Sequence, residues 1–223
     1  MQALQLVGEA VLIIVSVYVA IVLEGASSDR DARTSALESL QIVRTELETD
    51  LGEARAYADQ KRDREVLFSD LSSWLRSDAT IPTDSFSATI EGILTGNYTV
   101  FPRRAAWTTM VSQGQLESLG DPELVSRLAE LYEHWSGRVI YNGEAYDEAI
   151  WIVTRETIPS VWDRRVSHFV RLDRASRLEL DAQLVHLEIW NKSYGALLTL
   201  WAAEIEDVLV EVDDHLDRSG GGA

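Results

Sequence analysis

The sequence predicts an all-α protein: an N-terminal transmembrane helix that continues into an elongated antiparallel bundle of three long helices plus short helices. Two observations support this class. Residues 4–23 (LQLVGEAVLIIVSVYVAIVL) are apolar over about 20 positions, the length that a helix needs to cross the roughly 30 Å hydrocarbon layer of a membrane. The remaining chain repeats apolar residues at steps of three and four, and it has no strand pattern longer than four residues.

Residues 1–25 are expected to be a retained membrane anchor. A cleaved signal peptide would begin with basic residues, whereas MQALQLVGE has none, and the residues before Gly25 form a poor cleavage site. A buried core helix is a weak alternative, because positions 10–23 have no polar face. Glu9 stands at the edge of this apolar stretch, where a charge either pairs with a neighbouring helix or reaches the headgroup layer. We expect Glu9 and Tyr18 to contact a partner or the membrane.

Composition limits what the rest of the chain can bind. The protein has 223 residues, a net charge of -17 and no cysteine, so disulfides, thiolate metal sites and a cysteine nucleophile are excluded. This acidity argues against nucleic acid as a partner, because phosphates require a basic surface, and it favours basic, neutral or apolar partners. One soluble domain is expected at 26–218, followed by a flexible Gly-rich tail at 219–223.

The first half of the soluble part is expected to contain one long and two short helices. Apolar residues recur at helical spacing from 37 to 75, and this helix must end before Pro82, which excludes helical geometry for the residue that precedes it. A short helix is predicted at 86–94, followed by a loop. A second one at 103–119 is interrupted or ended around Gly114.

The second half is expected to contain the other two long helices. Asp121, Pro122 and Glu123 form a strong helix start, and this helix is expected to continue until Pro159 breaks it. The clearest periodicity begins near residue 178. It comprises Leu187, Trp190, Tyr194, Leu197, Trp201, Ile205, Val208 and Val212. These steps of three and four are typical of a bundle or coiled-coil seam, which we expect to pack against the helices at 35–76 and 122–156.

Three quoted segments carry a resemblance to a known family. They are GEAVLIIVSVYVAIVL at 8–23, ELETDL at 46–51 and AWTTMVSQGQLESLGDPELVSRLAELYE at 106–133. The chain resembles a family of uncharacterised bacterial single-pass membrane proteins, a domain-of-unknown-function family, over roughly its first 135 residues. The resemblance implies a Gly-Glu-led anchor before a helical domain, and it implies no activity. Family members usually begin with a longer basic extension, whereas eight residues precede Glu9 here.

The orientation in the membrane follows from two conflicting signals. Arg30 and Arg33 directly after the anchor favour a cytoplasmic domain by the positive-inside rule. The basic extension of the family implies the opposite. We therefore expect a single-pass protein of the bacterial inner membrane with a periplasmic domain, and a cytoplasmic domain is the alternative.

The sequence contains no catalytic signature. It has no Gly-rich phosphate loop, no Gly-x-Ser-x-Gly elbow and no His-Glu-x-x-His motif. His134 follows Glu130, and His215 follows Glu211, at a spacing that can bind metal, but a di-iron bundle needs Glu-x-x-His units, and none is present. We expect no enzymatic activity, no metal and no cofactor, and we interpret these pairs as ion pairs on helices.

Aromatic and basic residues outside the long helices are the candidates for external contacts. Five arginines between 164 and 177 form a basic island, which we expect at the membrane-proximal end of the bundle, where arginines can meet lipid phosphates and aromatic rings can enter the interface. Pairing with the acidic helices is the alternative. The predicted partner or membrane contacts are Glu9, Tyr18, Trp107, Trp162, Arg164, Arg165, Phe169, Arg171 and Arg174.

Two classes of function remain. In the first, the chain is a non-enzymatic accessory subunit that docks on a larger integral membrane protein complex, either energy-transducing or a transporter. In the second, it is a sensor or ligand-binding bundle, which would signal through a partner because the chain shows no output domain. The acidic run from Glu204 to Asp217 is either a solvated helix face or a dock for a basic partner. The lipid bilayer is an expected partner in both cases, and a homo-oligomer is possible.

Overall fold

The computed structural model describes residues 2–77, 80–95, 98–163, 165, 168–170 and 173–220, with side chains from Ser28 onward except that of His168. The helical elements are α1 (Gln2–Arg76), α2 (Thr83–Leu94), α3 (Ala105–Ser112), the 3-10 turn η1 (Glu117–Leu119), α4 (Pro122–Ala129), the π-helical turn η2 (Glu130–Trp135), α5 (Ser136–Ile152), the π-helical turn η3 (Val153–Thr157), α6 (Ile158–Val161) and α7 (Arg174–Gly220). Two short strands, β1 (Trp162–Asp163) and β2 (His168–Phe169), pair antiparallel.

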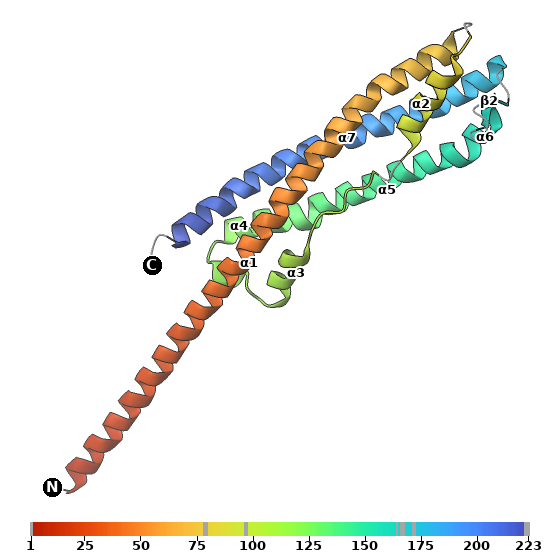
Figure 1. Cartoon of the computed structure of the whole chain (residues 1–223). Coiled ribbons are helices and arrows are strands. Elements are labelled where there is room, and N and C mark those ends of the chain that lie inside the picture. Colours follow the sequence, from red (N-terminus) through yellow and green to blue (C-terminus); the bar gives the residue numbers. More distant parts are fainter. Residues whose placement is uncertain are drawn as a thin grey trace.

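Three long helical stretches form an elongated bundle (Figure 1). Helix α7 runs antiparallel to α1, as Arg44 near the start of the bundle bonds Asp213 near the end of α7, at 2.5 Å. The α4–α6 stretch is also antiparallel to α7, since Tyr146 donates to Asn191 at 3.1 Å while Asp121 lies 3.2 Å from His215. The predicted all-α class is therefore confirmed. The bundle is not antiparallel throughout, because α1 and α4–α6 run in the same direction.

Helix α1 continues unbroken into the bundle, as predicted, and ends at Arg76. Residues 28–35 are all exposed, and Ala36 is the first buried residue after them. The helix thus leaves the bundle alone toward the N-terminus (Figure 1). Among the described residues, no helix combines the length and the apolar character needed to cross a membrane. The anchor predicted at 4–23 falls where side chains are outside the described residues.

The core lies between α1, α7 and α4–α6. The predicted α7 seam is buried against the other long helices: Leu187, Ile205, Val208 and Val212 are 0 % exposed. Trp201 is 1 % exposed, and of the eight seam residues Trp190 is the one that remains partly buried. The prediction that this seam forms the bundle interior is confirmed.

An extended segment at 98–104 fills the groove between the long helices. Its backbone N–H groups donate to side chains of all three: Asp147 from α5, Tyr194 from α7 and Asp50 from α1. Extended residues advance about 3.3 Å each, compared with 1.5 Å in a helix, so a short segment travels far back along α1. The chain therefore returns to the N-terminal end of the bundle, where Gln115 bonds Ser35 at 3.0 Å.

One predicted helix end is confirmed and two differ in detail from the prediction. Gly114 ends α3 with a φ of 67°, as expected from its sequence position. Pro159 does not break the third long helix, which continues to Val161. The π-helical turn η3 directly precedes α6, so Pro159 falls in the first turn of that helix, where a missing N–H group is tolerated. Helix α2 begins at Thr83 with no side-chain cap, although the predicted short helix itself is present.

Candidate functional site

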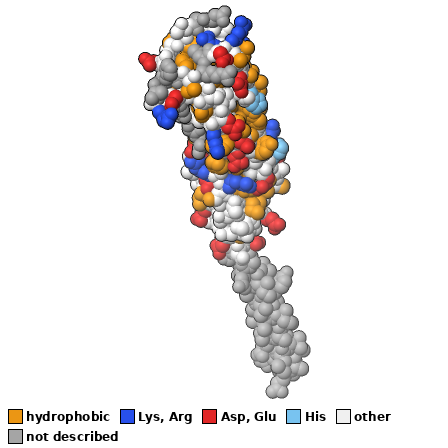
Figure 2. Space-filling model, turned by 90° about the vertical axis from the view of Figure 1, so that its right-hand side faces the viewer, with side chains coloured by type: hydrophobic (Ala, Val, Ile, Leu, Met, Phe, Trp, Pro, Cys, Tyr) orange, Lys and Arg blue, Asp and Glu red, His pale blue; other side chains and the backbone are white. Residues whose placement is uncertain are grey.

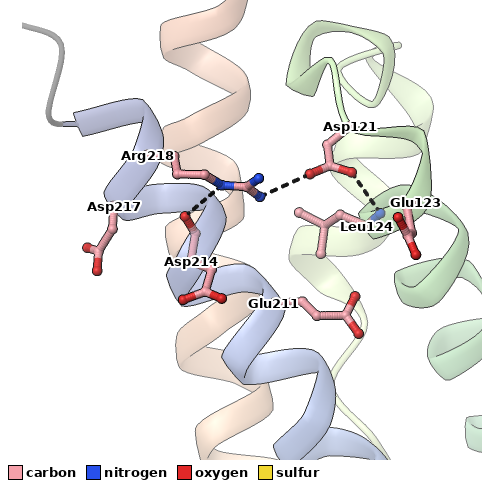
Figure 3. Close-up of a pocket in the computed structure, with 7 residues that line it drawn as sticks. All are labelled: Asp121, Glu123, Leu124, Glu211, Asp214, Asp217 and Arg218. Carbon is pink, nitrogen blue, oxygen red and sulfur yellow. Dashed lines mark hydrogen bonds and ion pairs between the residues drawn. The ribbon is translucent and has the colours of Figure 1, made fainter.

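A pocket of about 700 Å³ opens where the C-terminal end of α7 meets the start of α4 (Figure 3). Its walls are mainly acidic. The lining residues are Asp121, Glu123, Leu124, Glu211, Asp214, Asp217 and Arg218. The lining thus has five carboxylates and one guanidinium, so the pocket carries a net negative charge and suits a basic group.

Asp121 holds the two helices together at this pocket. It caps α4 by accepting the N–H of Leu124 at 3.1 Å, and its other oxygen lies 3.2 Å from His215 Nδ1 and 3.3 Å from Arg218 Nη2. The Leu124 N–H is the main cause of the lowered pKa of Asp121, with smaller contributions from His215 and Arg218. The predicted Asp-Pro-Glu helix start is confirmed, and both oxygens of the Asp121 carboxylate already have partners within the chain. Glu211 is also paired, because its carboxylate accepts from Arg127 Nε at 3.2 Å, so Glu123, Asp214 and Asp217 are the pocket carboxylates best placed to meet an external cation.

The pocket lies at the end of the bundle from which α1 departs toward the N-terminus (Figure 1). A second acidic hollow of about 410 Å³ adjoins it and is lined by Gln41, Arg44, Asp213, Leu216 and Asp217. Asp217 belongs to both. We name this acidic part of the surface the anchor-side end.

A second unusual cluster lies in the middle of the bundle, around Lys61. This residue is 1 % exposed, and its Nζ lies 3.9 Å from the ring centre of Tyr98 and 4.1 Å from that of Tyr146. Within the described part of the chain, Nζ has no hydrogen-bond partner. Arg64, one turn further along α1, lies 3.6 Å from the Tyr98 ring centre. Two basic side chains therefore share one set of aromatic faces.

Burial is the main reason that the pKa of Lys61 falls to about 6, and the neighbouring Arg64 lowers it further. Asp147 acts in the opposite direction, but its oxygens accept the N–H groups of Tyr98 and Thr99 at 2.8 and 3.1 Å. Burial also raises the pKa of Tyr146 to about 12. At neutral pH these shifts favour an uncharged Lys61 amine among un-ionised phenols, with the Arg64 guanidinium as the neighbouring charge.

Close backbone approach makes this centre possible. A Cβ at Gly195 would lie 2.9 Å from Lys61 Cβ, and Asn191 Nδ2 donates to the Lys61 carbonyl at 2.7 Å. Lys61 was not among the predicted site residues. The signal was present, since this lysine occupies the step between Ala58 and Phe68 on the buried face of α1, where an apolar residue is expected.

The predicted basic island lies at the opposite end from the one expected. Arg177 Nη1 donates to the carbonyl of Ser77 at 2.8 Å, just beyond the end of α1, so the island sits at the distal end of the bundle. The expectation of a membrane-proximal position was wrong because the chain returns along α1 before α4 begins. Figure 2 shows basic and acidic side chains together at this distal end.

The individual residues of the island differ in environment. Arg165 is exposed and lowers the pKa of Asp163 to about 2 through a 2.8 Å ion pair within the same connection, and not with an acidic helix. Arg174 is exposed at the first position of α7. The side chains of Arg164 and Arg171 are outside the described residues, as are those of Glu9 and Tyr18.

The aromatic candidates lie in the interior. Trp162 is 2 % exposed and packs on Phe169 and Phe86 at 4.7 and 5.1 Å between ring centres, and Phe169 is half-buried. Trp107 is 3 % exposed and stacks on Tyr132 at 5.2 Å. These tryptophans were expected at the surface because they occur in short segments. The structure corrects this, because each short segment packs against a long helix and buries its ring.

No three His, Asp or Glu side chains in the described ranges are arranged to hold a metal ion. The family model of a family of unknown function, DUF6090, matches residues 9–157, so the chain belongs to this family. The resemblance to an uncharacterised family is confirmed at this level. No curated protein and no solved structure matches the chain.

Proposed function

We propose that this chain is a non-enzymatic, membrane-anchored accessory subunit that docks on a larger bacterial membrane protein complex and stabilises it. The host would be an energy-transducing complex or a transporter. The chain would be a single-pass protein of the inner membrane, with its bundle on the periplasmic side and the cytoplasmic side as the alternative.

The observation that carries the proposal is the continuity of α1. One helix of 75 residues includes the apolar stretch at 4–23 and also supplies one wall of the bundle. A continuous helix has no hinge between its parts, so an anchor and bundle joined in this way would be held in a fixed relation. Such rigidity suits a brace or a cover on a membrane complex.

The anchor-side end gives further support. Its acidic pocket is lined by the elements at the end of the bundle from which α1 departs, so a partner that surrounds the anchor would lie close to this surface. Opposite charge on the partner would speed association and fix its orientation. The net charge of -17 makes a basic surface on the partner the complementary one.

The test is purification of the full chain from its own membranes in a mild detergent. We expect a defined integral membrane complex to elute with it in constant proportion, and removal of residues 1–25 to abolish this association. Elution of the full chain alone, with the detergent shown to preserve other complexes of that membrane, would contradict the proposal.

A second candidate is a sensor bundle that signals through a partner, and one observation favours it. Lys61 is a buried amine without a hydrogen-bond partner among the described residues, and its pKa of about 6 lies where modest acidification would protonate it. A proton-dependent change in the bundle would distinguish this candidate. The test is hydrogen exchange at pH 5 and pH 7.5. Lower protection at pH 5 than at pH 7.5 around Lys61 and the 98–104 segment, measured relative to the intrinsic exchange rate at each pH, would favour the sensor.

A further inference from the structure

The outer face of α7 carries a stripe of exposed aliphatic side chains. Ile189, Leu200 and Val210 are 58, 59 and 61 % exposed, and steps of eleven and ten residues place them on one side of the helix. Eleven residues are close to three helical turns, so Ile189 and Leu200 project in nearly the same direction. Val210, ten residues after Leu200, is rotated by about 80° from it, and the three side chains span about 30 Å of helix. Ser193, Ala196 and Ala203 lie exposed between them. We name this surface the outer α7 face.

The spacing of the outer α7 face indicates what could cover it. Positions 189, 193, 196, 200, 203 and 210 follow steps of three and four, with one position, Asp207, inserted before the last. This is the pattern of a second helix-packing seam, opposite to the seam buried in the bundle. Small residues between larger ones allow a partner helix to approach closely.

Charge changes along this face. Between residues 189 and 203 the exposed charged side chain is Lys192, which is already paired with Glu188 at 2.6 Å. From Glu206 onward, exposed carboxylates follow at Asp207 and Asp214, and the seam continues into the acidic pocket. The face is thus neutral in its distal part and acidic at the anchor-side end. A partner helix must match both parts.

We propose that the outer α7 face binds an α-helix of the host complex that has apolar residues at three- and four-residue steps and Lys or Arg at its membrane-side end. The proposal rests on the proposed function and names the chemistry of the docking partner. The apolar seam supplies contact area, and the basic end of the partner enters the acidic pocket beside Asp214 and Asp217. The pairing fixes the direction of the partner helix.

A second copy of the chain is a poorer occupant of this face. In a parallel pair, the Asp207 side chains of the two copies would face each other within the seam, with both acidic pockets alongside and a charge of -17 on each copy. An antiparallel pair would send the two N-terminal helices in opposite directions, which does not suit two anchors in one membrane.

The test is site-specific photo-crosslinking with the full chain in its own membranes. A benzophenone amino acid replaces Leu200 or Val210, and the matched control position is Val66, which is 62 % exposed on α1. We expect an adduct from the two α7 positions and none from Val66. The partner peptide linked to Val210 should be a helical segment that carries Lys or Arg, and the peptide linked to Leu200 should be apolar.

A paired substitution measures the energetic contribution of the face. L200K should reduce the co-purified complex about tenfold or more, because it places a charge at the centre of an apolar seam, whereas V66K should leave the yield unchanged. Equal melting temperatures of the two variants would show that the bundle remains folded.

Three outcomes would overturn the proposal: an adduct between two copies of α7, a partner peptide that is acidic or not helical, or no adduct above that of Val66. If the complex co-purifies while the outer α7 face gives no adduct, docking uses another surface and the proposed function stands. If no complex co-purifies in the first place, the proposed function itself fails.

Discussion

Asp50 and Lys61 lie eleven residues apart on the same face of α1, and each is 1 % exposed, but their surroundings differ. Asp50 accepts bonds from the backbone N–H and the guanidinium of Arg103, at 2.9 and 2.6 Å. Lys61 has aromatic rings around its Nζ and no hydrogen-bond partner among the described residues. One helix therefore buries a paired charge and an unpaired amine three turns apart.

This difference shows how a buried ionisable group is accommodated. Burial raises the pKa of the Asp50 carboxylate, and the two hydrogen bonds from Arg103 oppose this rise. A buried amine without a carboxylate loses its proton instead, because the desolvation of the cation is not offset. The first arrangement locks the 98–104 segment to α1, and the second leaves a group that responds to pH.

The largest expected effect follows from breaking the paired site. D50A leaves the Arg103 guanidinium and N–H without their acceptor, so we expect the free energy of unfolding to fall by about 3–5 kcal/mol in urea titrations. E53A removes the second partner of Arg103. The Glu53 side chain is 40 % exposed, so this variant should change the free energy of unfolding by about 0–1 kcal/mol. Similar losses in the two variants would contradict the distinction between them.

Removal of the unpaired amine should have the opposite sign. K61M replaces an amine whose burial disfavours its charged form, so we expect the free energy of unfolding at pH 7 to rise by about 1–4 kcal/mol. K192M alters the one other lysine, which is exposed on α7, and should have an effect within about 0.5 kcal/mol.

The pH dependence of stability provides the control for this substitution. The pKa of Lys61 is about 6 in the folded chain and 10.5 ordinarily, so unfolding takes up a proton between these values. The Lys61 contribution to the free energy of unfolding therefore rises with pH by about 1.4 kcal/mol per unit from pH 6 to pH 10, and it levels off below pH 6. K61M should lose this slope. An unchanged slope would mean that another group carries it.

A smaller effect is expected where the backbone approaches the lysine centre. A Cβ at Gly143 would lie 2.7 Å from Tyr194 Oη and 2.8 Å from the Cα of Thr99, so G143A must displace the 98–104 segment and should destabilise by about 1–3 kcal/mol. Gly52 on α1 has no neighbour within 4 Å of such a Cβ, so G52A should stabilise by about 0.5–1 kcal/mol. Thermal melts of the two variants would show this contrast, and a loss at Gly52 equal to that at Gly143 would refute the packing argument.

Periodicity in the sequence was sufficient to predict the long helices. The α7 seam from Leu187 to Val212 and the Asp121 cap follow from local patterns, and both are present. The course of the chain between α2 and α4 was not predictable in this way, because the extended segment is held by Asp147, Tyr194 and Asp50, which are far away in sequence. Because the return of the chain along α1 was not predicted, the basic island was also placed at the wrong end of the bundle.

The candidate sites were less predictable than the fold. The acidic run on α7 indicated a dock for a basic partner, but its meeting with Asp121 and Glu123 in one pocket depends on tertiary packing. Trp107 and Trp162 were misplaced because a short segment gives no periodicity from which burial can be inferred. Lys61 was missed because the buried face of α1 was predicted from its apolar residues alone.

The most direct test of the account of the bundle interior is an NMR titration of the full chain labelled with ¹³C and ¹⁵N in lysine only. The chain has two lysines, so two side-chain signals are expected, and K192M assigns them. Lys61 should titrate near pH 6, whereas the pair with Glu188 raises the pKa of Lys192 above its ordinary value of 10.5. Two lysine signals that both titrate above pH 9 would contradict the neutral buried amine.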